Sequence, residues 1–277
     1  MIKDDPFFWF THNTISIPGV REEHLLMHIT DTHVNVFDEE STEEERSAAE
    51  KQDEMWQTFK SRFAEANGEP YGDPQRISTR EAFERQLALA EELTPEVLLL
   101  SGDNLEFSHP AGARYLTEKL GAYSGKTMIV PGNHEDQTFG DLWSPGVKTM
   151  ELDGFRIAAV DDSRKTVSQA DLDALRVLCG EGIPVIILCH VPLATPWCRT
   201  LCVEKMTGRN DYFYLDSDSE DANGRAFVDL CMNDDAVRAV ICGHVHGYHR
   251  MELVPGKPQI IGSQGMAGAV DLITVTG

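Results

Sequence analysis

The sequence has few basic residues for its length. Its 277 residues contain 24 Lys and Arg against 46 Asp and Glu, which gives a formal net charge of −22 at pH 7. Proteins that bind nucleic acids or anionic membranes present basic patches. The shortage of positive charge therefore argues against a nucleic-acid or membrane surface. The acids concentrate in residues 38–54 and 211–221, and we interpret both segments as solvated faces.

Long apolar runs are also missing. The longest, Val97–Leu100 and Val185–Cys189, have the length of strands, whereas a transmembrane helix needs about 20 apolar residues. We therefore expect no membrane-spanning segment. The first ten residues, MIKDDPFFWF, place two acids and a proline before a short aromatic run. Because a signal peptide has a basic start and a longer apolar stretch, we expect none here and predict a cytoplasmic protein.

The chain has six cysteines but no CxxC pair. Cys189 and Cys242 end apolar runs, so we expect them to be buried thiols that pack as small hydrophobic residues. Cys198 and Cys202 could form a disulfide or a metal clip, but the CxxC…CxxC partners expected of such a metal site are absent. This pattern favours a reducing compartment.

What the chain does contain is a regular alternation of short apolar runs and amphipathic segments. With 41% hydrophobic residues and no repeat or flexible linker, it is predicted to form one α/β domain over residues 1–277. Strands are expected at 24–30, 96–101, 126–130, 155–160, 184–189, 237–242, 251–254, 259–261 and 269–275. Helices are expected at 41–66, 78–93, 111–122 and from Ser168 onward.

Two segments are predicted to be inserts in this alternation. Residues 40–67 form a helical insert, in which Ser41 and Glu44 have the spacing of a capping box. Residues 193–223 show little periodicity and are predicted to be a long loop. Loops of that length are usually functional or disordered. Because this one carries aromatic and basic residues, we expect it to fold over the site and to select the substrate, with the helical insert on the other side.

Residue types that bind metals cluster directly after the predicted strands. A lone histidine or aspartate at such a place is usually a core or turn residue, but five strand ends carry them here. Ligands of α/β proteins bind beyond the carboxyl ends of strands, so we expect a site at this edge. Gly102, Gly132 and Gly243 each precede a candidate and allow a sharp turn and a close approach. The candidates are Asp31, His33, Asp103, Asn133, His134, His190, His244 and His246.

As an ordered set, these motifs resemble those of the calcineurin-like metallophosphoesterase family. They are Asp31-Thr-His33, Gly102-Asp103, Gly132-Asn133-His134-Glu135, His190 and Gly243-His244-Val-His246. Each block is weak alone, but the set spans residues 31–246 in the family order. The resemblance implies a four-layer α/β/β/α sandwich, in which two mixed sheets pack face to face between flanking helices. It also implies a binuclear metal-dependent phosphoesterase.

The resemblance assigns a role to each motif side chain. The first metal would be bound by Asp31, His33 and His246, and the second by Asn133, His190 and His244. Asp103 would bridge both, and His134 would assist the leaving group without binding metal. Imidazole and carboxylate ligands suit Mn, Fe or Zn as divalent or trivalent ions. Two such ions, about 3.5–4 Å apart, can generate a bridging hydroxide that attacks phosphorus in line.

The motifs constrain the substrate less. Purple acid phosphatases carry a metal-binding tyrosine just after the bridging aspartate, whereas this chain has Asn-Leu-Glu106. An acid at this place is similar to the cyclic-nucleotide-phosphodiesterase-like branch, although only one histidine, His190, precedes Val-Pro. We expect a small organic phosphate, either diester or monoester; the alternative is a catalytically dead scaffold of the same fold. The candidate substrate contacts are Arg199, Lys205, Arg209 and His109.

Overall fold

The structure of the protein is a computed structural model that describes residues 4–71, 76–135, 142–200 and 213–277. The strands are β1 (Trp9–Ser16), β2 (His24–Ile29), β3 (Val97–Ser101), β4 (Lys126–Val130), β5 (Lys148–Leu152), β6 (Phe155–Ala159), β7 (Val185–Leu188), β8 (Val237–Cys242), β9 (His249–Val254), β10 (Lys257–Ile261) and β11 (Ala269–Thr276). The helices are α1 (Glu43–Asn67), α2 (Thr79–Leu93), α3 (Pro110–Ala122), α4 (Gln169–Gly180), α5 (Pro196–Thr200) and α6 (Ala222–Asn233), with a 3₁₀ turn at Gly265–Ala267. None of the described helices is both long and apolar enough to cross a membrane.

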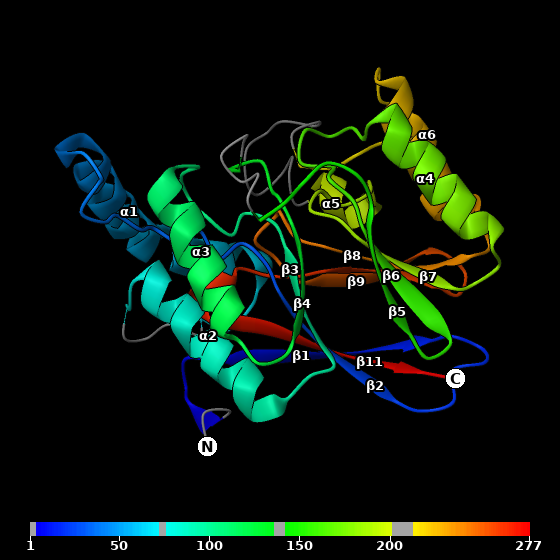
Figure 1. The fold of residues 1–277 in the computed structure, drawn as a ribbon, viewed down its shortest axis with the longest axis horizontal. Helices are drawn as coiled ribbons and strands as arrows, with labels where there is room; N and C mark the ends of the chain where they lie inside the picture. The colour runs from blue at the N-terminus through cyan, green and yellow to red at the C-terminus, as the bar shows by residue number, and fades with distance from the viewer. Residues whose placement is uncertain (1–3, 72–75, 136–141, 201–212) are drawn as a thin grey trace.

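The strands form two mixed sheets, as predicted. One has the order β1-β11-β2-β3-β4 and the other β5-β6-β7-β8-β10-β9. In the first sheet β2, β3 and β4 are parallel, and in the second β6, β7, β8 and β10 are parallel. Figure 1 shows the strands in the middle, with α1, α2 and α3 on one side and α4 and α6 on the other. This arrangement confirms the expected α/β sandwich of two mixed sheets with flanking helices.

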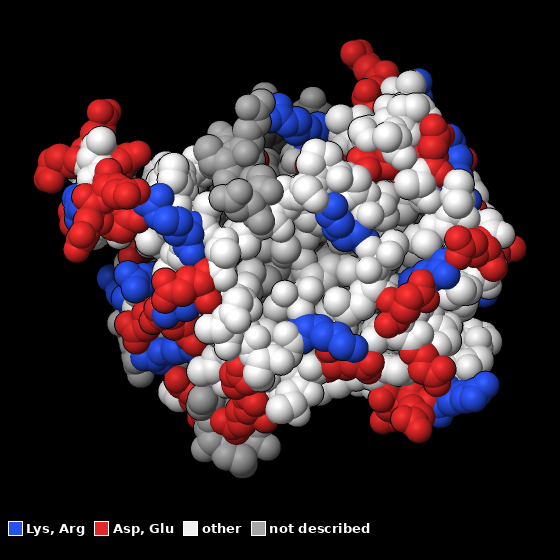
Figure 2. Space-filling view, viewed as in Figure 1, with Lys and Arg blue, Asp and Glu red and all other residues white. Residues whose placement is uncertain are grey.

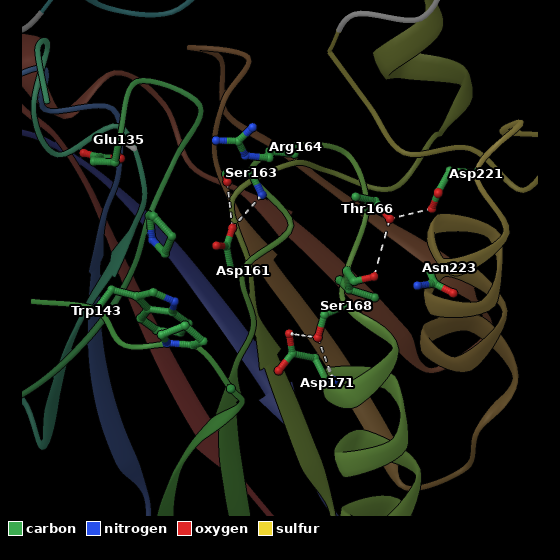
Figure 3. Close-up of a pocket in the computed structure, with 14 residues that line it drawn as sticks. Glu135, Trp143, Asp161, Ser163, Arg164, Thr166, Ser168, Asp171, Asp221 and Asn223 are labelled. Carbon is green, nitrogen blue, oxygen red and sulfur yellow. Dashed lines mark hydrogen bonds between the residues drawn. The ribbon is translucent and has the colours of Figure 1, made fainter. Parts of the chain in front are cut away.

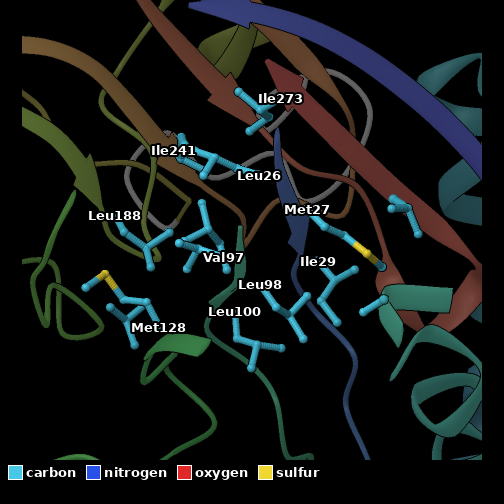
Figure 4. Packing of buried hydrophobic residues seen from close by; sticks show 14 of the residues in the cluster. Leu26, Met27, Ile29, Val97, Leu98, Leu100, Met128, Leu188, Ile241 and Ile273 are labelled. Carbon is cyan, nitrogen blue, oxygen red and sulfur yellow. The ribbon is translucent and has the colours of Figure 1, made fainter. Parts of the chain in front are cut away.

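The alternation of side chains along the strands explains why both faces of the second sheet are covered. On β7, Ile186 and Leu188 join the core that includes the first sheet, whereas Val185 and Ile187 join a second core beneath α4 and α6. Successive strand residues point to opposite faces, so a run of apolar residues without alternation indicates burial on both sides. Figure 4 shows Leu188 and Ile241 near Leu26 of the first sheet.

Two strands were not predicted from the sequence, and both lie at sheet edges. β1 pairs only with β11, and β5 pairs only with β6. Their residues are mostly half-buried or exposed. Because an edge strand is partly solvated, it needs fewer apolar residues and gives a weaker pattern. The predicted loop 193–223 also contains a helix, α5, and ends in α6, which begins at Ala222.

Helix α1 begins one residue later than predicted. The capping box is formed by Thr42 and Glu45 instead of Ser41 and Glu44: the Thr42 backbone N–H donates to the Glu45 carboxylate at 2.6 Å, and the Glu45 N–H donates to the Thr42 hydroxyl at 3.2 Å. The Ser41 hydroxyl instead accepts the Asp38 backbone N–H at 3.0 Å. The acids of this segment are largely exposed, and Figure 2 shows them at the projecting end of α1.

The carboxyl group of Glu69, just after α1, is expected to make stability depend on pH. It accepts the Ser263 hydroxyl at 2.6 Å and the Tyr248 backbone N–H. Burial, with the charge of Asp271, raises the pKa of Glu69 from 4.5 to about 7. Between these values the folded state binds more protons than the unfolded state, so stability falls as the pH rises. We expect Glu69→Gln to reduce the stability that is lost between these pH values by about 3 kcal/mol.

Urea denaturation of both proteins at pH 5 and pH 8 measures the effect. The variant should gain stability relative to the wild type as the pH rises, because the neutral amide needs no proton. A stability difference that is the same at both pH values would contradict this expectation.

Candidate metal centre

The loops that follow β2, β3, β4, β7 and β8 bring the predicted ligands together. Within the described residues, two groups of ligand atoms share the carboxylate of Asp103, and in each group all the atoms lie within 4.8 Å of one another. All the atoms belong to buried residues. The first group is Asp31, His33, Asp103 and His246, and the second is Asp103, His190 and His244.

In the first group, nitrogen and oxygen atoms converge on one point. His246 Nε2 lies 3.3 Å from Asp31 Oδ1 and 3.1 Å from His33 Nε2. Asp103 Oδ2 lies 3.7 Å from His33 Nε2. Two imidazole nitrogens and two carboxylate oxygens therefore face one another at the distances that a shared cation would require.

The second group meets the other oxygen of the same carboxylate. Asp103 Oδ1 lies 3.4 Å from His190 Nε2, which is also 3.1 Å from Asn133 Oδ1. The ring of His244 lies 4.8 Å from that of His190, measured between centroids. One oxygen of Asp103 thus points at each group, which is the arrangement of a bridging ligand.

In two histidine ligands, the ring nitrogen that points away from the centre makes a hydrogen bond. These bonds indicate whether the other nitrogen can bind a cation. His190 Nδ1 lies 2.8 Å from the Ser101 carbonyl, to which it must donate. Nε2 then faces the oxygens of Asp103 and Asn133, and its lone pair is available to an ion once the ring has lost its second proton. His33 has the same arrangement, since its Nδ1 lies 2.7 Å from the Glu106 carboxylate. A metal ion in each group would satisfy these lone pairs, and nitrogen and oxygen donors without cysteine suit Mn, Fe or Zn.

The electrostatics of the protein alone also favour positive charge at the centre. Burial lowers the pKa of His190, but Asp103 and then Asp31 raise it to about 10. Burial likewise opposes ionisation of Asp103, yet His190 and His33 keep the pKa of Asp103 well below its usual value. Burial also opposes ionisation of Asp31, but His246 outweighs burial and lowers the pKa of Asp31. Asp31 and Asp103 are therefore both ionised at neutral pH and can bind a cation.

The backbone of the ligands is unusual. Asp31, His33, Asp103, His244 and His246 all have positive φ, between 44° and 73°. Such conformations are uncommon outside glycine and persist at functional sites when the surrounding fold enforces them. From the sequence we expected the sharp turns at the glycines that precede the ligands, and Gly102 does have a positive φ of +95°. A Cβ on Gly132 would overlap the carboxylate of Asp103, which explains why glycine stands there.

Three buried carboxylates that do not join the two groups hold the ligand loops. Glu135 accepts the backbone N–H of Asp103 at 3.1 Å and that of Leu105 at 2.7 Å. Asp162 accepts the backbone N–H of His190 at 2.8 Å and so supports the loop that carries this ligand. Burial raises the pKa of Glu135 to about 7 and that of Asp162 to about 6. The third, Glu106, accepts from Trp56 Nε1 at 3.0 Å and orients His33.

A further buried chain of side chains was missed by sequence reasoning. His28 is fully buried and links Asp271 at 2.7 Å to the Ser101 hydroxyl at 2.7 Å. The Ser101 carbonyl in turn accepts from His190. The position of His28 in an apolar run indicates only that it is buried. Its partners come from β11 and β3 and can be identified only in the folded structure.

His134 lies beside the two groups and is partly open to solvent. Its backbone N–H donates to Asp103 Oδ1 at 3.0 Å, and its Nδ1 lies 3.0 Å from the Glu106 carbonyl. Its side chain is 32% exposed. Burial lowers the pKa of His134, but Asp103 and Glu106 outweigh burial and raise it above its ordinary value. His134 therefore has the protonation tendency of a general acid, and about a third of its side chain is accessible to solvent.

The predicted substrate contacts have different surroundings. Arg199 is paired with Asp216 and lies over the Tyr214 ring at 5.4 Å. His109 caps α3 by accepting the Gly112 backbone N–H at 3.4 Å. The structure thus gives both residues local structural partners and places neither in the two ligand groups. Lys205 and Arg209 lie outside the described residues.

Both predicted inserts contribute aromatic rings to the ligand groups. From α1, Trp56 lies 4.6 Å from the His33 ring and Phe63 lies 4.7 Å from the His246 ring. From the other insert, Phe213 lies 5.3 Å from the His244 ring. Trp197 stacks on His249, with 4.2 Å between the centroids and 2° between the planes. The ligands are therefore bordered by half-buried aromatic surface on two sides.

Metal binding is expected to stabilise the fold. Ions that bind only the folded state stabilise it by about 2.7 kcal/mol per site at a concentration of 100 times Kd. For a chain of this size, chelation should lower Tm by roughly 5–10 °C per site, and Mn²⁺ or Zn²⁺ should restore it. Differential scanning calorimetry with metal content checked by elemental analysis measures this. An unchanged Tm after verified removal of metal would contradict it.

Comparisons with known proteins show which fold and which family this chain is similar to. No curated protein matches the chain. A dimetal phosphatase from Danio rerio superposes with a TM-score of 0.51 at 11% identity, over 88% of each chain. Purple acid phosphatase PPD1 from yellow lupin (Lupinus luteus) seeds gives a TM-score of 0.55 at 10% identity, over 91% of this chain and 46% of that one. At such identities the likeness shows the fold alone. The sequence model of the calcineurin-like phosphoesterases matches residues 24–248, so the chain belongs to the calcineurin-like phosphoesterase family.

Proposed function

We propose that the protein is a binuclear metallophosphoesterase that hydrolyses a phosphodiester or a phosphomonoester. One observation carries the proposal: the two oxygens of Asp103 face separate groups of buried nitrogen and oxygen ligands, with His134 beside them. A structural site would need one closed ligand set, whereas two sets that share one carboxylate suit a pair of ions acting together.

The residues of the centre have two roles: some would bind the ions, and His134 would transfer a proton. Two Mn, Fe or Zn ions, when bound, would neutralise phosphoryl oxygens and lower the pKa of an attacking water. Asp103 fixes the spacing of the two sites, and Glu106 fixes the ring of His33. His134 is held at Nδ1 by the Glu106 carbonyl, so its Nε2 is available to protonate the leaving oxygen.

The substrate in this proposal is a small organic phosphate. The aromatic rings of Phe63 and Phe213 beside the ligands suit the organic part of an ester. The net charge of −22 disfavours a nucleic-acid polymer as the substrate. The five described cysteines are free, buried thiols, which supports a reducing compartment such as the cytoplasm.

Hydrolysis of p-nitrophenyl phosphate and bis(p-nitrophenyl) phosphate tests the proposal. Protein reconstituted with Mn²⁺ should hydrolyse at least one of them, and a chelator should abolish the activity. The ratio of the two rates separates monoester from diester preference. Metal-loaded protein that binds two ions but hydrolyses neither compound would favour the catalytically dead scaffold.

A further inference from the structure

Two of the loops that build the candidate metal centre also line a pocket. Its cavity volume is about 720 Å³, which falls in the range of small-molecule sites. Figure 3 shows that its walls come from the segments after β4 and β6 and from the starts of α4 and α6. The residues that matter below are Trp143, Asp161, Arg164, Asp171, Asp221 and Asn223.

Short connections link this pocket to the metal ligands. Glu135, which lines the pocket, follows His134 directly and accepts the backbone N–H of Asp103 at 3.1 Å. Asp161 and Ser163 line it from both sides of Asp162, which accepts the His190 N–H at 2.8 Å. The pocket therefore shares its walls with the loops that carry His134 and His190.

The polar atoms of the pocket are mainly acceptors. Three hydroxyl groups each donate to a neighbouring carboxylate: Ser163 to Asp161 at 2.7 Å, Ser168 to Asp171 at 2.6 Å and Thr166 to Asp221 at 2.5 Å. Figure 3 draws these pairs around the cavity. Because the hydroxyl protons are used within the pairs, the pairs offer oxygen lone pairs to a ligand.

Two other side chains supply donors. The Arg164 side chain is exposed at the pocket, and the Asn223 amide lies across from it on α6. Trp143, with Pro131 and Pro145, adds an apolar wall. The pocket thus combines many acceptors, a few donors and one flat apolar surface.

This combination selects among ligand classes. Asp161, Asp171 and Asp221 repel an anionic group, while each already accepts a hydroxyl proton from a neighbour and Arg164 offsets part of their charge. A hydroxyl group both donates and accepts, so several of them on one molecule match such a lining, while the carbon face of a sugar ring packs on apolar surface. We propose that this pocket binds a neutral, polyhydroxylated leaving group, of which a monosaccharide is the model, and that Arg164 and Asn223 determine this specificity; the proposal rests on the proposed phosphoesterase function.

A matched pair of substrates tests the specificity. Glucose 6-phosphate and cyclohexylmethyl phosphate both place a six-membered ring one carbon from the ester oxygen, but only the first carries ring hydroxyls. Each should be offered as the monoester and as the methyl diester. We expect kcat/KM to favour the sugar ester at least tenfold, because the analogue leaves the pocket's polar groups unpaired.

Variants then assign the preference to the pocket. Arg164→Met and Asn223→Leu should each reduce the preference about tenfold, mainly through KM, and should leave hydrolysis of the p-nitrophenyl esters within about twofold of the wild type. Arg176→Met is the matched control, because Arg176 is an exposed arginine of α4 that pairs with Asp173. Equal rates for the two ring substrates in the wild type would overturn the proposal, as would an equal loss on all substrates or a preference for phosphocholine.

A binding measurement separates this proposal from the proposed function. Saturation-transfer NMR with free glucose needs no catalysis, and the signal should be present in the wild type and in Arg176→Met but weakened in Arg164→Met. If the wild type hydrolyses no ester yet shows this pattern, the phosphoesterase function fails and the pocket assignment stands. If the esters are hydrolysed but glucose gives no signal and no preference, the function stands and the pocket assignment fails.

Discussion

Replacing Asp103 by alanine is expected to have the largest effect of any single substitution. Its two oxygens lie 3.7 Å from His33 Nε2 and 3.4 Å from His190 Nε2, so the change removes a ligand from both groups at once. Metal ions contribute several kcal/mol to the stabilisation of transition-state charge, which corresponds to a loss on the order of a thousandfold or more in kcat/KM. The variant should also retain fewer than two ions per chain.

The measurement is a rate with p-nitrophenyl esters, together with elemental analysis of the dialysed protein. Asp271→Asn serves as a control, since Asp271 is also a buried, histidine-bound carboxylate but belongs to neither ligand group. Asp271→Asn should keep its metal content. Two tightly held ions in Asp103→Ala would show that this carboxylate does not bridge the sites.

His134→Ala should reduce turnover while the protein keeps both ions. The backbone N–H of His134 donates to Asp103, a contact that alanine retains, whereas the side chain meets the Glu106 carbonyl through Nδ1 and is 32% exposed. Loss of a general acid typically lowers the rate by about 10²–10⁴. The effect should be smaller for esters with good leaving groups, because a stable phenolate leaves without a proton.

The test compares the rates of hydrolysis of alkyl and nitrophenyl esters by His134→Ala and the wild type. His12→Ala is the matched control: His12 is an exposed histidine of β1, and its loss should change neither rate nor metal content. A metal loss in His134→Ala, or a rate loss that is the same for all leaving groups, would contradict a role at the leaving group.

Much of this architecture is local and therefore predictable. Val237–Cys242 and Lys126–Val130 were predicted as strands and are found with those bounds, because runs rich in β-branched residues favour strands. The ligand motifs could be found for the same reason, because they lie close to the strands in the sequence. Each ligand follows its strand by one to four residues, so once the strands are placed, the ligands must meet at one edge.

Other features depend on partners that are remote in sequence. Thr42 rather than Ser41 caps α1 because Asp38 occupies the Ser41 hydroxyl. Arg164 follows an aspartate pair in an unremarkable loop, and only the fold places it in a pocket with Asn223, nearly 60 residues away in the chain. Basic residues in the long insert appeared to be better substrate contacts, but Arg199 is engaged by Asp216.

The left-handed backbone of five ligands also has a consequence for engineering. A non-glycine residue in this conformation costs roughly 1–2 kcal/mol, and here the cost falls on Asp31, His33, Asp103, His244 and His246 together. A selection for thermal stability without metal would therefore favour glycine at these positions and steadily erase the site. The same selection with Mn²⁺ or Zn²⁺ present would keep them, so the metal content of the medium decides whether directed evolution of this protein preserves or discards its chemistry.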